Sequence, residues 1–387
     1  MRKKKVFLNI VLFITLLIAI GINIYGRKEQ GAPASIDTEL QSIMPEGDSF
    51  KKKLDPFLYY EIYKKKRLIG HSFNTKDAAP KKKGYGGPIE ILVGLDKAGD
   101  IENLKVLLHN ETPMYADGIK TAKFLDQFKG KGHEDRFIVG EDIDGITQAT
   151  ISSRAVSGIL KASVDNMQAV IAGSSIERAA QEPLSLDIDF HVTVSIITFL
   201  LIAFYLKVSL LRYIGLFASI VYFGFCKANF IAMSNLGSIF LWNLPDLNSN
   251  ITWYVFIFSG LILTFLLGGF YCSYMCPFGG LQIFLNKIFR FNIEITPGVA
   301  NRLRKIRFFL LWILTMVVLV SNNPNVVIYE PFSTVFLIKG SLIAWCIALI
   351  ILVLSLFHHR PFCSYFCSAG AFLDLVSKTG RRIFRRR

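Results

Sequence analysis

Four of the six cysteines in this sequence fall into two short stretches that repeat each other. The first stretch holds Cys272 and Cys276 and the second holds Cys363 and Cys367, each pair in a Cys-Ser-Tyr-x-Cys core with glycine close behind. Paired cysteines at this spacing are typical of metal or redox sites. Four sulfurs suit one zinc ion or one iron–sulfur cluster, and spacing alone does not separate the two. Four ordinary buried cysteines are the alternative without chemistry.

A second stretch, residues 144–153, surrounds Thr150 with small and polar residues. Apolar residues behind it recur at the i, i+3, i+4 and i+8 spacing of one helix face, so we expect Thr150 at a helix entrance. The N–H groups there are unpaired and the helix dipole is positive, which favours a phosphate. A phosphoester on Thr150 would be well placed. An N-cap cluster without any cofactor is the simpler interpretation.

The same stretch resembles the acceptor motif of proteins that carry FMN esterified through its phosphate to a threonine. The matching residues are Asp144, Gly145, Thr147, Ala149 and Thr150, while Gln148 stands where the family usually has glycine. Residues 84–89 and 109–113, the latter with Glu111 and Thr112, also resemble this FMN-binding domain in order and spacing. The resemblance implies covalent FMN on Thr150, installed by a flavin transferase, with the other matching residues around it.

The composition indicates a membrane protein. The 387 residues are 52% hydrophobic and only 19% charged, with a mean hydropathy of +0.42, which is too apolar for a soluble chain of this length. The net charge of +15 comes from short basic runs beside apolar segments. Such runs orient helices in a bilayer, so we expect no nucleic-acid partner.

Three domains are expected. Residues 1–26 form a transmembrane anchor, because a basic run precedes an apolar one from residue 6 to about residue 24; a cleaved signal peptide is the alternative. Residues 27–187 form an exported α+β domain, with a hairpin at 61–73, paired strands at 89–95 and 101–108, a helix at 121–128, and the helix after Thr150 packed on the sheet.

Residues 188–387 form an all-α polytopic membrane domain. Apolar runs near 188–206, 213–233, 253–270, 308–320 and 335–357 predict five spans, or about six with the anchor. Lys and Arg occur at 207–212, at 287–307 and in the tail from residue 360 onward, but not at 242–252 or 322–334. The positive-inside rule then puts both termini and both cysteine pairs at the cytoplasmic face and the exported domain outside. A reducing cytosol disfavours disulfides there.

The membrane half resembles proteins of the NosR/NirI type, which join this FMN domain to spans with Cys-x-x-x-Cys-Pro motifs. Cys276 is followed by Pro277, whereas Cys367 is followed by Ser368. The short plan of the chain is most similar to the C proteins of reductive-dehalogenase operons (PceC/RdhC type).

Two polar residues in the membrane half are candidates for a quinone site, with menaquinone as the expected ligand. Lys227 falls inside the third apolar run, where a charge is costly unless it is paired or hydrated; a span that ends early is the alternative. His191 lies near the outer end of the second span, where an interfacial role is the simpler interpretation. The apolar runs place no histidine pair at mid-membrane for a haem.

These features predict a membrane-bound electron-transfer flavoprotein in the bacterial cell membrane, rather than a stand-alone enzyme. It would relay electrons between a quinone pool or cytoplasmic donor and an extracytoplasmic redox partner, such as a reductive dehalogenase. A redox sensor, or a maturation factor for an exported reductase, is the rival hypothesis. A transporter is a weaker one, because intramembrane ionisable residues are few.

Overall fold

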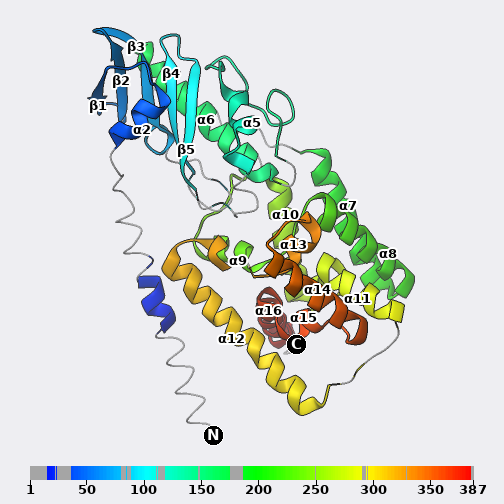
Figure 1. Ribbon diagram of the computed structural model, residues 1–387. Coiled ribbons are helices and arrows are strands. Elements are labelled where there is room, and N and C mark those ends of the chain that lie inside the picture. Colours follow the sequence, from blue (N-terminus) through cyan, green and yellow to red (C-terminus); the bar gives the residue numbers. More distant parts are fainter. Residues whose placement is uncertain are drawn as a thin grey trace. The chain divides into compact units, whose positions relative to one another are not determined.

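A computed structural model describes residues 15–21, 23, 36–79, 84, 89–109, 111, 118–146, 149–174, 186–248, 250–289, 293, 295–327 and 329–384 (Figure 1). The chain divides into two compact units. One comprises Ile24–Pro183 and Trp242–Ser249, and the other comprises Met1–Asn23, Leu184–Leu241 and Asn250–Arg387. Each unit is described separately.

The first unit is built on a five-stranded antiparallel sheet in which each strand pairs with the next one along the chain. The strands are β1 (Ser49–Lys53), β2 (Tyr59–Lys64), β3 (Arg67–Asn74), β4 (Ile89–Asp96) and β5 (Ile101–His109). The hairpin at 61–73 and the paired strands at 89–95 and 101–108 are therefore confirmed. The edge strand β1 was not predicted. Its run of lysines is typical of an edge that must not pair with another chain.

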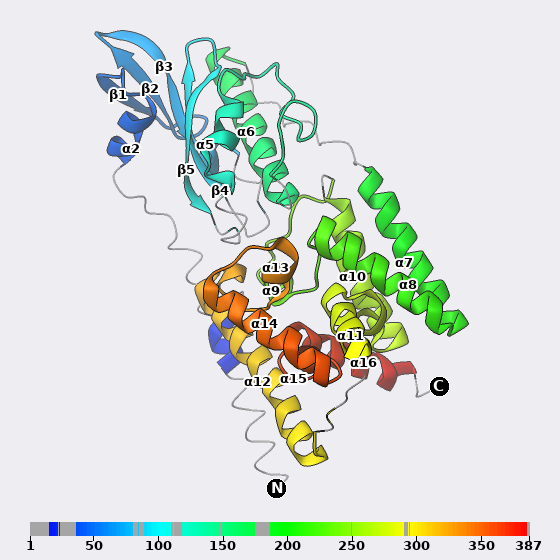
Figure 2. The same cartoon turned by 45° about the vertical axis from the view of Figure 1, so that its right-hand side comes forward.

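Helices cover both faces of this sheet. They are α2 (Ile36–Ile43), α3 (Thr75–Ala78), α5 (Ala122–Leu125) with the 3₁₀ turn η1 (Asp126–Phe128), and α6 (Thr150–Ile171). The α+β architecture and the helix at 121–128 agree with the sequence analysis. Figures 1 and 2 show α6 along one face and α2 against the other.

Side-chain alternation along the strands explains the two layers. In β4, Ile91, Val93 and Leu95 point to one core and Leu92 to the other, because successive residues of a strand face opposite sides. The α6 helix fills the larger core with Val156, Ile159, Leu160, Val164 and Met167, all at most 1% exposed. Each such side chain contributes roughly 1.5–3 kcal/mol through burial. The apolar stripe behind Thr150 thus does pack α6 onto the sheet, as predicted.

The second unit is helical. Its elements are α7 (Ile188–Leu206), α8 (Ser209–Ser219), the π-helix η2 (Ile220–Cys226), α9 (Met233–Phe240), α10 (Ile251–Leu267), the π-turn η3 (Tyr271–Met275), α11 (Pro277–Phe289), α12 (Pro297–Ser321), the 3₁₀ turn η4 (Pro324–Val327), α13 (Phe332–Leu337), α14 (Leu342–Phe357), α15 (Pro361–Tyr365) and α16 (Ser368–Phe384).

Two helices of the described chain are long and apolar enough to cross a membrane, namely α7 and the continuous α8–η2 helix, Ser209–Cys226. The apolar helices α10 and α14 are shorter, at 17 and 16 residues. Six spans therefore stay a prediction, and most of the expected N-terminal anchor lies outside the described residues.

The structure corrects two predicted span boundaries. The run at 213–233 is not one span, because the helix ends at Cys226 and Ala228 adopts a positive φ. The run at 335–357 is broken after α13, where Ile338 has a φ of 54°. Lys227 therefore lies at a helix end, which supports the interpretation that this span ends early.

Candidate functional site

Thr150 is the first residue of α6, as the sequence predicts. Its backbone is described but its side chain is not, and Thr147, Gln148 and Thr112 lie outside the described residues. The residue before it, Ala149, has a non-helical backbone (φ −119°, ψ 36°) and no side chain that could cap the helix. The N–H groups of the first turn have no partners inside a helix. This end of α6 can therefore receive an anionic phosphate.

Ser153 closes the turn that presents Thr150. The Ser153 hydroxyl accepts from the Ile146 N–H at 3.0 Å and donates to the Ala149 carbonyl at 3.0 Å. The Ala149 N–H in turn donates to the Ile146 carbonyl at 2.9 Å. These bonds join both ends of the acceptor segment, so the position of Thr150 is set by its own motif.

Glu111 reaches the same helix turn from a distant part of the chain. Its carboxylate, only 4% exposed, accepts a short hydrogen bond from the Ser152 hydroxyl. Gly84 lies against it, since a Cβ added to Gly84 would clash with Glu111 Oε1. The three segments that resemble the FMN-binding domain therefore meet at the start of α6. Ser152 was not singled out by the sequence analysis, although it lies in the same motif.

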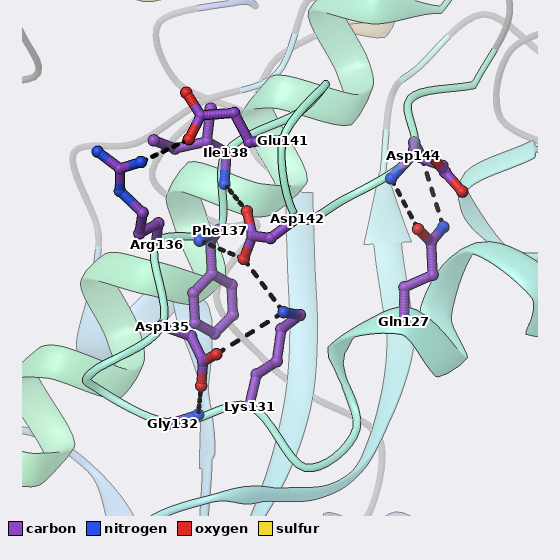
Figure 3. Close-up of polar contacts among 10 residues, drawn as sticks. All are labelled: Gln127, Lys131, Gly132, Asp135, Arg136, Phe137, Ile138, Glu141, Asp142 and Asp144. Carbon is purple, nitrogen blue, oxygen red and sulfur yellow. Dashed lines mark hydrogen bonds and ion pairs between the residues drawn. The ribbon is translucent and has the colours of Figure 1, made fainter.

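Asp144 is held by its backbone. Its N–H donates to Gln127 Oε1 at 2.7 Å and its carbonyl accepts from Gln127 Nε2 at 3.4 Å, whereas the residue itself is exposed (Figure 3). Nearby, Asp142 accepts from the N–H groups of Phe137 and Ile138 at 3.0 and 2.6 Å. Burial raises the pKa of Asp142, but the Ile138 N–H and the Lys131 ammonium outweigh it and lower this pKa below its usual range. The loop that leads to the acceptor is thus firmly braced.

The four repeat cysteines come together in the helical unit. Cys272 lies in η3 and Cys363 in α15, while Cys276 and Cys367 immediately precede α11 and α16. Cys363 and Cys272 both interact electrostatically with Cys276 and with Cys367. The two repeats also share the same local N–H···S hydrogen bond. Gly279 N–H donates to Cys276 Sγ at 3.4 Å, and Gly370 N–H donates to Cys367 Sγ at 3.1 Å.

These cysteines lie within the helical unit, and their position at the cytoplasmic face stays a prediction. Lys287, near the end of α11, lies over the Tyr213 ring near the start of α8, at 3.8 Å. Gly280, near the start of α11, lies against Ile220 in the middle of the α8–η2 helix. The two helices are therefore antiparallel. Cys276 precedes Lys287 by eleven residues, or roughly 16 Å along a helix axis.

Cys272 and Cys276 reach this position because the chain turns back after α10. Gly268 adopts a φ of +84°, which favours glycine, and the Tyr271 N–H then donates to Thr264 Oγ1, one turn inside α10. The Tyr271 hydroxyl accepts from the Ile231 N–H at 2.8 Å. An apolar run followed by glycines does not indicate such a reversal in sequence.

The second cysteine motif is held by hydrogen bonds to two residues that were not predicted from the sequence. The Tyr329 hydroxyl donates to the Phe366 carbonyl at 2.8 Å and accepts from the Ser368 N–H at 3.1 Å. Glu330, 7% exposed, accepts from the Ser368 hydroxyl at 3.1 Å and from the Met233 N–H at 2.9 Å. Proline, which follows the last cysteine of the first motif, could make neither Ser368 bond.

Gln282 and Arg360 also lie at the cysteine site and were missed. The fully buried Gln282 amide donates to Cys363 Sγ at 3.0 Å and accepts from the Phe362 N–H at 3.2 Å. The Arg360 guanidinium donates a short bond to the Cys272 carbonyl and interacts electrostatically with Cys363, Cys272 and Cys276. Neither residue belongs to the Cys-x-x-x-Cys pattern that marks the site in sequence.

Comparison with known families agrees with both sites. Residues 84–165 match the family model of the FMN-binding domain, and residues 249–296 and 342–387 match that of a 4Fe-4S binding domain. This chain carries an FMN-binding domain and a 4Fe-4S binding domain. The pairing is that of a NosR-type FMN membrane flavoprotein, which confirms the resemblance seen in the sequence.

Three relatives illustrate the relationship. The chain is 27% identical to a component of the proton-translocating ferredoxin:NAD(+) oxidoreductase complex of Clostridium ljungdahlii, over 35% of this chain and 72% of that component. It is 32% identical to a component of the ion-translocating oxidoreductase complex of Photorhabdus laumondii, over 27% and 54%. It is 30% identical to the regulatory protein NosR of Pseudomonas aeruginosa, over 28% and 16%. The chain thus spans about half of the second relative and less of the third.

The family match favours a cluster over zinc. Within the described ranges, no three His, Cys, Asp or Glu side chains are arranged to hold one metal ion. Tetrahedral zinc, with Zn–S bonds of about 2.3 Å, needs sulfurs roughly 4 Å apart. A four-iron cluster binds each sulfur through a different iron, so its ligands lie further apart. Arg360 Nε, buried and without a partner in the described part of the chain, adds a positive donor that fits an anionic thiolate cluster.

Lys227 and His191 lie near one end of the α7 and α8–η2 helices. Lys227 Nζ pairs with Asp189 Oδ2 at 2.5 Å, and the Tyr222 hydroxyl donates to Asp189 Oδ1 at 3.2 Å. His191, in the same first turn of α7, is exposed. The lysine charge is therefore paired, and the 4Fe-4S domain does not include this cluster of polar residues.

Proposed function

We propose that this electron-transfer flavoprotein is a multi-pass protein that carries FMN on Thr150 outside the cell membrane and a 4Fe-4S cluster on four cysteines at its cytoplasmic face. It relays electrons between a quinone pool or cytoplasmic donor and an extracytoplasmic redox partner, such as a reductive dehalogenase. The observation that carries the proposal is the pairing of the two domains in one membrane chain. The bound flavin and cluster supply the electron-transfer chemistry.

The flavin half of the proposal rests on the start of α6. Thr150 occupies the first helical position, Ser153 and Ile146 close the turn around it, and Glu111 anchors the next residues through Ser152. Backbone N–H groups of the first turn would hold the phosphate diester. The exposed Asp144 would face the flavin transferase during attachment, because its backbone is pinned by Gln127 while the residue stays open to solvent.

Mass spectrometry of the Thr150 peptide tests this half. We expect one FMN mass when a flavin transferase is co-expressed. Thr150→Val keeps the shape of the side chain without its hydroxyl and should abolish the adduct, whereas Thr147→Ala, at a flanking position, should retain some. Covalent flavin on the Thr150→Val protein would refute the assignment.

The cluster half rests on Cys272, Cys276, Cys363 and Cys367. A hydrocarbon layer of roughly 30 Å would separate this cluster from an extracytoplasmic flavin, which is long for one direct electron step. Iron and sulfide in anaerobically purified protein, lost in both Cys272→Ser and Cys363→Ser, would support one shared cluster.

A quinone near Lys227 and His191 would complete the relay. Asp189, Tyr222 and Lys227 form a polar group at the ends of two apolar helices, where quinone carbonyls could accept hydrogen bonds. Lys227→Met or His191→Ala should slow menaquinol-driven reduction of the FMN and leave its covalent attachment unchanged. Wild-type rates in both variants would remove these residues from the path.

A redox sensor or maturation factor is the second candidate, and the regulatory name of the NosR relative favours it. In that case the flavin and the cluster report redox state and need not turn over. Sustained quinol oxidation by purified protein in liposomes, with an external electron acceptor, would support the relay. Its absence in protein that holds both cofactors would favour the sensor.

A further inference from the structure

The Gln282 side chain links the two halves of the cysteine repeat. It lies on α11, six residues after Cys276, and is 0% exposed. Its Nε2 donates to Cys363 Sγ at 3.0 Å, and its Oε1 accepts from the Phe362 N–H at 3.2 Å. A buried amide is costly unless its polar atoms are paired. Here one of those pairings is made to the sulfur of a ligand candidate in the other repeat.

The second repeat has no counterpart of this donor. The residue six positions after Cys367 is Leu373, which is buried and apolar. Likewise, the residue three positions before Cys363 is Arg360, but the residue three before Cys272 is Gly269. The repeat is therefore symmetric in its cysteines and asymmetric in the polar groups around them. Both the amide and the guanidinium act on Cys363.

A hydrogen bond to a thiolate ligand withdraws charge from the sulfur. It stabilises the reduced form of a cluster more than the oxidised form, because the reduced form carries one more negative charge, and so it raises the reduction potential. The effect is larger in a buried, low-dielectric site than in water. Gln282 has the geometry and the burial for this effect.

We propose that Gln282 is a positioning residue that raises the reduction potential of the cluster through its N–H···S hydrogen bond to Cys363. The inference rests on the proposed four-cysteine cluster and adds a residue outside the cysteine motifs. It also explains why the polar groups around the cysteines differ between the two repeats. Gln282 donates to a ligand of the second repeat, whereas Leu373, at the equivalent position, has no side-chain donor.

Redox titration of the full-length protein, followed by electron paramagnetic resonance of the reduced cluster, tests the proposal. Gln282→Met and Gln282→Leu both remove the donor but differ in shape. We expect a more negative midpoint potential in both, together with a higher Fe–S(Cys) stretching frequency in resonance Raman spectra. Leu373→Met, at the equivalent position of the second repeat, is the matched control and should keep the wild-type potential.

The outcomes separate this inference from the proposed function. Wild-type protein without iron and sulfide would refute the cluster itself. Loaded Met and Leu variants with the wild-type potential and Raman frequency would overturn the role of Gln282 and leave the cluster standing. If only one variant assembles a cluster, the midpoint potential of that variant alone tests the role of Gln282. Loss of the cluster in both variants would assign Gln282 a role in cluster assembly and contradict a role in setting the reduction potential.

Discussion

At the scale of single residues, the flavin site depends on groups that hold the Thr150 turn in place. Ser153 is fully buried and is bonded to both Ile146 and Ala149, so one hydroxyl closes the acceptor turn. Glu111 performs a similar task through Ser152 from 41 positions away in the chain. The Thr150 turn is thus supported both locally and by a distant segment.

Ser153→Ala should destabilise the FMN-binding domain by about 1–3 kcal/mol, because the Ile146 N–H loses its acceptor. The fraction of protein with covalent FMN should fall as well. Both quantities can be measured by denaturant unfolding monitored through flavin fluorescence and by intact mass. Ser157→Ala is the control, since the Ser157 hydroxyl, one turn further on, is buried without a partner in the described residues. Equal losses in the two variants would contradict the role of Ser153.

His71 makes the same domain sensitive to acid. Burial lowers the pKa of His71, and the Glu61 carboxylate opposite it offsets only part of this shift. The unfolded chain takes up a proton near pH 6.5, whereas the folded domain resists it. Stability is therefore full above about pH 6.5 and decreases as the pH falls through that value toward the lower folded-state pKa.

His71→Phe should reduce this acid sensitivity, since the phenyl ring does not titrate. The measurement is the thermal midpoint of unfolding of the domain, followed by the change in flavin fluorescence, at pH 7.5 and 5.5. Between pH 7.5 and pH 5.5, the thermal midpoint of the wild type should fall more than that of the variant. The same loss in both proteins would place the acid-sensitive group elsewhere.

At the scale of elements, the second cysteine motif is built from three separate pieces of chain. Glu330 lies between the N-terminal ends of α9 and α16, where two sets of N–H groups favour a carboxylate. Tyr329 bonds to the residues on both sides of Cys367. The Lys- and Arg-free segment at 322–334, expected as an outer loop, thus reaches into the cysteine site.

Tyr329→Phe removes only one hydroxyl and should lower the iron content of the purified protein. Glu330→Ala should lower it further, because it leaves the Met233 N–H and the Ser368 hydroxyl without their acceptor, at about 1–3 kcal/mol each. Tyr213→Phe, whose ring lies under Lys287 at the far end of α11, is the matched control and should keep full iron. Full iron in the Glu330→Ala protein would show that the second motif needs no such support.

At the scale of the whole molecule, the proposed topology rests on the distribution of charge. Basic residues gather at the α7–α8 connection, at the start of α12 and in α16, whereas the stretches at 242–252 and 322–334 have none. This asymmetry predicts a cytoplasmic C-terminus and an extracytoplasmic FMN-binding domain. The repeat cysteines are poor reporters of sidedness, because Cys276 and Cys367 are buried and Cys272 and Cys363 are half-buried.

Single cysteines at exposed positions test this topology. In a Cys226→Ser and Cys346→Ser background, which removes the two exposed thiols, Ala172→Cys should react with an impermeant maleimide on intact cells. Thr379→Cys, exposed on α16, should react only after permeabilisation. The reverse pattern would invert the predicted orientation.

Much of this protein can be predicted from its sequence, because the signals are local. The stripe behind Thr150 has the period of a helix face, and the strands at 89–95 and 101–108 flank a turn of polar and small residues, so α6 and the β4–β5 pair follow from short-range pattern. The cysteine repeat likewise shows itself through residue type and spacing alone. These features depend on neighbours a few positions apart.

Other features were decided only by tertiary structure. The reversal after Gly268 carries the cysteines into the bundle, and Tyr329, Glu330 and Gln282 gain their roles from contacts with residues 37 to 97 positions away in sequence. A buried Gln or Glu looks the same in sequence as an exposed one, because its burial depends on which helices pack around it. The sequence therefore determined the candidate ligands and the candidate acceptor, while packing alone decided their supports and the asymmetry between the polar groups around the two repeats.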